Sequence, residues 1–145
     1  FDIAITTVGC LGWLPDLPRF AARVAALLRA GGCFFIHEIH PLSEMLPYDG
    51  PAGTDLRRLT EPYFKPEPYV DIGGLDYLGG AQYESEEAQY WFVHTLSGVI
   101  TALIDQGLAI EHFREYDAAI SPHQKPVEAL NAGVPLSYTL IARKT

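Results

Sequence analysis

FDIAITTVGCLGWLPDLPRFAARVAALLRAGGCFFIHEIHP, residues 1–41, is the stretch that decides the fold. An apolar strand over 1–6 runs into a loop, and an amphipathic helix then leads to a second apolar strand over 32–39. A strand, a helix and another strand in this order predict a parallel crossover, the unit of α/β sheets. Because such sheets bind ligands beyond the carboxyl ends of their strands, we expect the functional residues after positions 6 and 36.

The helix of this unit has recognisable ends. Asp16 is a suitable N-cap and Pro18 is tolerated in the first turn, while Gly31 can adopt the left-handed conformation that ends a helix. The apolar positions at helical spacing are Phe20, Val24, Leu27 and Leu28. The strand over 32–39 is almost continuously apolar until His37, which predicts helices on both of its faces.

The segment over about 41–95 has a different character. Six prolines fall between 41 and 68, which excludes long regular elements there, and the aromatic content favours an ordered lid over a linker. We expect a short helix at 55–59, and a strand or hairpin at 69–78 with Gly73-Gly74 as its turn. The run Tyr90–Val93 is β-prone.

The last third of the chain predicts a helix followed by a hairpin. Thr95 or Ser97 caps a helix that Gly107 ends, and its apolar face includes Val99 and Leu103. Strands are expected at 108–116 and 137–143, joined by a polar loop over 117–135. A loop of that length suits a closing antiparallel hairpin.

Composition narrows the class of protein. A chain of 145 residues with 48% hydrophobic residues predicts one packed domain, and no apolar run approaches the roughly 20 residues of a membrane span. Cys10 and Cys33 have no metal-type spacing and suit a reduced, cytoplasmic setting, and the first residues do not resemble a signal peptide. The net charge of −8 disfavours nucleic acid and anionic membranes, which leaves a small molecule as the expected partner.

The order of these elements resembles the carboxyl-terminal half of a class I S-adenosylmethionine-dependent methyltransferase. Phe1–Ala4 resembles strand four of that fold, Leu11–Leu17 the loop and helix that follow, and Gly31–Glu38 strand five. Tyr90–Ser97 resembles the segment over the acceptor pocket of small-molecule members. The segments Leu108–His112 and Leu140–Arg143 resemble strands six and seven, the last of them antiparallel.

The resemblance implies a Rossmann-like α/β fold and methyl transfer from S-adenosylmethionine to a small molecule. The family's glycine-rich turn and the acidic residue after its second strand have no counterpart here, since the glycines at 73–74 and 79–80 do not follow a buried strand. We therefore expect 1–145 to be the carboxyl-terminal part of a single domain whose amino-terminal strands precede it. The alternatives are a non-catalytic, methyltransferase-like domain that acts in assembly, for example as a homodimer, and a nicotinamide-dependent oxidoreductase.

The resemblance also implies positions for the cofactor. Thr7, Val8 and Gly9 would form the turn beside the sulfonium and its methyl group, and Trp13 would stack on the adenine or line the pocket. Each residue has a structural alternative. The turn is equally an ordinary strand-to-helix connection, and Trp13 equally an anchor of the loop to the core.

Histidines are the candidate catalytic bases, because imidazole can remove a proton from a hydroxyl or amine near neutral pH. His37 and His94 are the two candidates, and a structural role is the alternative for each. Strand alternation puts His37 and Glu38 on opposite faces, so His37, Glu38 and His40 do not predict a metal site. The residues expected to contact the acceptor are His40, Tyr63, Phe64 and Trp91.

Overall fold

The computed structural model describes residues 1–47, 54–72 and 87–145. The expected turn at Gly73-Gly74 therefore lies outside the described residues. The strands are β1 (Ile3–Thr6), β2 (Cys33–Ile39), β3 (Tyr69–Asp71), β4 (Gln89–Trp91), β5 (Leu108–Tyr116) and β6 (Ser137–Lys144). The α-helices are α1 (Leu17–Leu27), α2 (Leu96–Ile104) and α3 (Lys125–Glu128), and the 3₁₀ turns are η1 (Leu11–Trp13), η2 (Ser43–Met45) and η3 (Pro122–Gln124).

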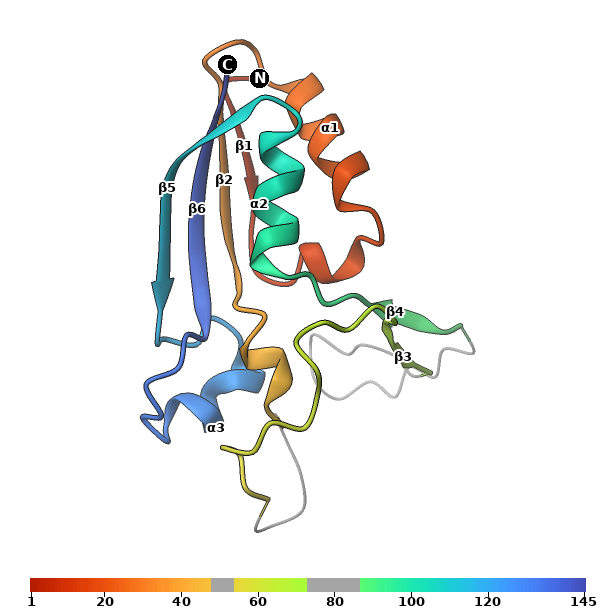
Figure 1. Ribbon diagram of the computed structural model, residues 1–145, viewed down its shortest axis with the longest axis vertical. Coiled ribbons are helices and arrows are strands. Elements are labelled where there is room, and N and C mark those ends of the chain that lie inside the picture. The colour runs from red at the N-terminus through yellow and green to blue at the C-terminus, as the bar shows by residue number, and fades with distance from the viewer. Residues whose placement is uncertain (48–53, 73–86) are drawn as a thin grey trace, which may run out of the picture.

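A four-stranded sheet in the order β1-β2-β6-β5 forms the body of the molecule (Figure 1). β1 and β2 are parallel, with Ile3 opposite Cys33 and Thr6 opposite Ile36. β6 runs antiparallel to both β2 and β5. The predicted crossover and the antiparallel closing strand are thus both confirmed.

Both long helices cover the same face of this sheet (Figure 1). Asp16 caps α1 by accepting the Arg19 N–H at 2.9 Å, and Thr95 caps α2 by accepting the Gly98 N–H at 3.0 Å. The buried residues that join helices and strands in one core are Leu17, Ala21, Val24, Leu28, Phe34, Ile36, Val99, Leu103, Leu108 and Leu140. The helix bounds follow the caps that the sequence predicts.

The expectation that helices cover both faces of β2 was wrong for the described residues. Phe34, Ile36 and Glu38 are buried beneath the helices, whereas Phe35, His37 and Ile39 on the other face are only half-buried. On the same uncovered face, Ile3 and Ile5 of the edge strand β1 are 61% and 62% exposed. An apolar run therefore did not distinguish one covered face from two.

The segment after β2 also differs in detail from the sequence prediction. Residues 55–58 form a turn, closed by Arg58 N–H to Asp55 O at 3.1 Å, and not a helix. β3 is a strand as expected, but it pairs antiparallel with β4. The loop over 117–135 contains the short helices η3 and α3, each with a proline in its first turn.

The described helices are all too short or too polar to cross a membrane.

Candidate functional site

The site lies where the parallel strands β1 and β2 end. Their carboxyl ends point to the same end of the molecule, where η1, η2 and the β3–β4 pair gather (Figure 1). After β1 the chain makes a turn closed by Cys10 N–H to Thr7 O at 3.2 Å, with Gly9 at a left-handed φ of 81°. This is the edge at which open α/β sheets bind their ligands.

Glu38 holds this turn in place. One carboxylate oxygen accepts the N–H groups of Gly9 at 2.6 Å and of Ile39 at 2.8 Å, and the other accepts the Leu11 N–H at 3.1 Å. Its side chain belongs to the helix-facing side of β2 and is only 5% exposed. These three N–H donors replace the hydrogen bonds to water that the carboxylate loses on burial.

Trp91 of β4 closes the site from the opposite side. A Cβ atom at Gly12 would lie 2.5 Å from the Trp91 indole, so only glycine allows this contact. Trp13 packs edge-on against the same indole, with ring centroids 5.4 Å apart. The Phe92 N–H donates to Gly12 O at 2.8 Å and fixes β4 to η1.

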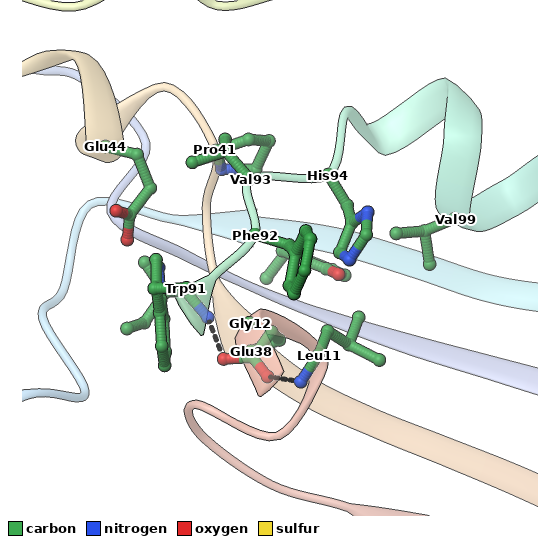
Figure 2. Close-up of a pocket in the computed structure, with 12 residues that line it drawn as sticks. Leu11, Gly12, Glu38, Pro41, Glu44, Trp91, Phe92, Val93, His94 and Val99 are labelled. Carbon is green, nitrogen blue, oxygen red and sulfur yellow. Dashed lines mark hydrogen bonds between the residues drawn. The ribbon is translucent and has the colours of Figure 1, made fainter. Parts of the chain in front are cut away.

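A small cavity of about 30 Å³ lies between these elements, with room for little more than water. Figure 2 shows Trp91 and Leu11 on either side of the Glu38 carboxylate, and His94 beside Phe92. The lining residues are Leu11, Gly12, Glu38, Ile39, Pro41, Glu44, Trp91, Phe92, Val93, His94, Val99 and Tyr138. Burial, and then the charge of Glu38, raises the pKa of the Tyr138 hydroxyl, which therefore stays protonated.

His94 is the predicted base that lines this cavity. Its Nε2 lies 2.7 Å from Leu14 O, and its ring stacks on Phe92 at 6.4 Å with an interplanar angle of 14°. A carbonyl oxygen can only accept, so the neutral imidazole carries its proton on Nε2 and its lone pair on Nδ1. The structure therefore leaves Nδ1 as the basic atom.

The structure does not bring His37 or His40 to the cavity. His37 is on the uncovered face of β2, 6.5 Å from the Tyr116 ring. His40 is 4% exposed, and both of its ring nitrogens are bonded, Nε2 to Glu115 at 2.9 Å and Nδ1 to the Leu42 N–H at 3.0 Å. Neither ring is in position to contact a ligand in this cavity.

Of the other predicted site residues, some lie near the cavity and some do not. Thr7, Val8 and Gly9 form the turn that Glu38 holds, and Val8 is 44% exposed. The Tyr63 hydroxyl accepts the Leu96 N–H at 3.3 Å, at the start of α2. Phe64 packs edge-on against Tyr63 but is 78% exposed and does not line the cavity.

Glu38 is the principal site residue that the sequence reasoning missed. The signal was present, since the two-residue period of the strand puts residue 38 on the same face as the apolar residues 34 and 36. A carboxylate on a buried face must find donors. Across residues 1–47, 54–72 and 87–145, no group of three or more His, Cys, Asp or Glu side chains could hold a metal ion.

Solved structures share the fold of this chain. A protein from Listeria monocytogenes assigned to the S-adenosylmethionine-dependent methyltransferases matches 100% of this chain and 62% of its own length, with a TM-score of 0.70 and 15% identity. An S-adenosylmethionine-dependent methyltransferase from Mesorhizobium loti matches 99% of this chain and 62% of its own, with a TM-score of 0.55 and 22% identity.

The chain has part of the Rossmann-like fold of the S-adenosylmethionine-dependent methyltransferases. It spans about three fifths of the length of these two proteins. Geranyl diphosphate C-methyltransferase from Streptomyces coelicolor, solved with S-adenosyl-L-homocysteine, matches 99% of this chain and 46% of its own, with a TM-score of 0.54 and 10% identity. Neither a protein-family model nor a curated protein sequence matches the chain.

Proposed function

We propose that the protein transfers a methyl group from S-adenosylmethionine to a small-molecule acceptor. The observation that carries this proposal is the arrangement at the carboxyl ends of β1 and β2, where the turn held by Glu38 faces Trp91 and His94, in a fold shared with S-adenosylmethionine-dependent methyltransferases. Glu38 on one side and Trp91 on the other fix the turn that borders this cavity.

Part of the cofactor fits the residues that are present. The Thr6 hydroxyl, at the carboxyl end of β1, is buried and has no hydrogen-bond partner among the described residues, so it can bind a polar group. We assign the methyl-bearing end of S-adenosylmethionine to Thr7, Val8 and Gly9, with Trp13 beside it. When bound, the cofactor supplies a methyl carbon activated by a positively charged sulfur. Holding the acceptor close to this carbon and in line with it can then provide much of the rate enhancement.

His94 is the proposed general base. Because Leu14 O holds the Nε2 proton, Nδ1 is free to take a proton from an acceptor hydroxyl or ammonium group. Trp91 and Phe92 would cover the acceptor with aromatic surface and exclude water. A small-molecule acceptor is supported by the likeness to geranyl diphosphate C-methyltransferase. His37 and His40 have no part in this proposal.

The test is cofactor binding by the intact protein. Calorimetry and thermal unfolding with S-adenosylhomocysteine should show one site, with a stabilisation of about 2.7 kcal/mol at a hundredfold excess over the dissociation constant. Transfer of labelled methyl groups to a library of small alcohols, phenols and amines then identifies the acceptor. A protein that binds neither S-adenosylmethionine nor S-adenosylhomocysteine disproves the proposal.

One observation favours a second candidate, a non-catalytic domain that acts in assembly. β1 is an edge strand within the described sheet, and its Ile3 and Ile5 are exposed. Exposed edge strands with apolar side chains pair readily with other chains. A dimer whose population rises with concentration, combined with no thermal shift from S-adenosylhomocysteine, would favour assembly over catalysis.

A further inference from the structure

The turn after β1 is held by one side chain, Glu38, at two positions. Its Oε1 accepts the Gly9 N–H at 2.6 Å, and its Oε2 accepts the Leu11 N–H at 3.1 Å. The two amides come from residues two apart, and the left-handed φ of Gly9 lies between the end of β1 and η1. The carboxylate therefore determines the path of the backbone from Gly9 to Leu11.

This backbone forms one wall of the cavity. Leu11 and Gly12 line it, and Gly12 contacts Trp91 closely enough that a Cβ atom there would overlap the indole. A shift of the turn therefore changes the distance between the proposed cofactor turn and the aromatic cover on β4. Among the described residues, no Lys or Arg side chain lines the cavity, and the Glu38 carboxylate accepts the backbone N–H groups of Gly9, Leu11 and Ile39.

We infer that Glu38 is a positioning residue for methyl transfer: it holds the turn after β1 at the place where methyl donor and acceptor meet. This inference rests on the proposed function for its catalytic consequence. Glu38 acts through the Gly9 and Leu11 backbone and takes no part in the bond changes. The charge of Glu38 also adds to burial in raising the pKa of the Cys10 thiol, which agrees with a carboxylate held against the turn.

Glutamate is required at this position for geometric reasons. The amide of Glu38→Gln keeps one acceptor oxygen, but its NH₂ group would face an N–H donor of the turn, which leaves that donor unpaired. The side chain of Glu38→Asp is one methylene shorter and cannot reach both amides. Both variants should loosen the turn while leaving the sheet in place.

The first measurement is amide hydrogen exchange at Gly9 and Leu11 in the intact protein. Exchange at these amides should be roughly 10- to 100-fold faster in Glu38→Gln than in wild type. Exchange in the core of β6 should change only as much as global stability does. Glu111→Gln is the matched control, because Glu111 is an exposed glutamate of β5 paired with Arg143 at 2.6 Å. It should leave the turn amides unchanged.

The second measurement is turnover at saturating cofactor and acceptor. Glu38→Gln should lower kcat on the order of 100-fold, because a displacement of about 1 Å is costly for near-attack geometry. Val24→Ala removes buried volume from α1, away from the cavity, and provides a variant of reduced stability whose kcat should stay unchanged.

Two results would overturn the inference. One is unchanged exchange at Gly9 and Leu11 in Glu38→Gln. The other is a kcat loss no greater than that of Val24→Ala at equal fraction folded. Failure of the proposed function is recognised separately. If the wild-type protein neither binds S-adenosylhomocysteine nor transfers methyl groups, Glu38 has no role in methyl transfer. The exchange data then still decide whether Glu38 holds the turn.

Discussion

Single residues organise the candidate site mainly through backbone groups. Glu38 accepts backbone N–H groups, His94 donates to Leu14 O, and the Tyr63 hydroxyl accepts the Leu96 N–H. In each case a side chain fixes the position of a distant part of the chain. The chemistry proposed for the site therefore depends on where loops are held as much as on which side chains face the cavity.

His94→Gln should remove the proposed base while preserving a hydrogen bond to Leu14 O. We expect kcat to fall about 10²- to 10⁴-fold, because a glutamine amide has no basic nitrogen. The exposed His123 provides the control, and His123→Gln should keep wild-type activity. A His94→Gln enzyme with the kcat of wild type would assign proton removal to another group or to water.

Gly12→Ala tests the contact between η1 and Trp91. The new Cβ would lie 2.5 Å from the indole, so we expect a loss of about 1–3 kcal/mol in the free energy of unfolding, typical of overpacking. The double variant Gly12→Ala/Trp91→Ala should show that the alanine at position 12 costs less once the indole is gone. Urea unfolding of the four proteins in this cycle measures the coupling. If the losses in the free energy of unfolding are additive, the alanine at position 12 does not clash with Trp91.

The strands and long helices could be predicted from sequence, but the pairing of the short strands β3 and β4 could not. α1, α2, β2, β5 and β6 follow from caps, glycine ends and apolar period. β3 and β4 have three residues each, and their pairing joins segments about twenty positions apart, so only tertiary contacts define which strands pair. Residues 55–58 contain a local acceptor, Asp55, whose side chain binds the Arg57 N–H at 3.1 Å and favours a turn over the predicted helix.

The candidate site shows the same difference between features visible in the local sequence and contacts made by residues far apart in it. The resemblance of Tyr90–Ser97 to the segment over the acceptor pocket led us to expect His94 and Trp91 near a pocket, and both line the cavity, while their proposed roles stay predictions. The burial of Glu38 could be predicted from strand alternation, but the turn that it holds could not, because the Gly9 and Leu11 amides are 29 and 27 residues away and no residue type reveals them. His40 was expected at the site because it follows a strand end, yet its Nε2 bonds Glu115 of β5 and its Nδ1 accepts the Leu42 N–H.

His94 lies directly before Thr95, the N-cap of α2, so this cap should influence both stability and the site. The Thr95 hydroxyl accepts the Gly98 N–H at 3.0 Å, and Thr95→Ala should lower the free energy of unfolding by about 1 kcal/mol. Thr95→Ser keeps the acceptor oxygen and should restore most of that loss. Chemical denaturation of the three proteins measures the effect. Equal losses in the alanine and serine variants would attribute the effect to the methyl group instead.

At the scale of the whole molecule, a buried polar network joins three distant segments. Gln124, which is 1% exposed, donates to the Ser43 hydroxyl, and that hydroxyl donates to His40 O at 2.7 Å. His40 in turn bonds Glu115 of β5 and packs edge-on against Tyr138 of β6 at 6.3 Å. The end of β2, the segment around η3 and the closing hairpin are therefore held together beside the cavity.

This network predicts a dependence of stability on pH. Burial lowers the pKa of His40 from its ordinary value of 6.5, against the opposing hydrogen bond and charge of Glu115. The unfolded chain therefore binds more protons than the folded protein between the two pKa values, and the free energy of unfolding rises with pH there. The contribution is complete above about pH 6.5 and is lost as pH falls through the lower, folded value.

His40→Gln removes the titrating group and so tests this dependence. Between about pH 8 and pH 5, the melting temperature of wild type should fall more steeply than that of His40→Gln, measured by calorimetry in the intact protein. His123→Gln removes an exposed histidine near the same network and should keep the wild-type slope. Parallel curves for wild type and His40→Gln would show that His40 has the same pKa folded and unfolded. The network would then join these segments without making them sensitive to acid.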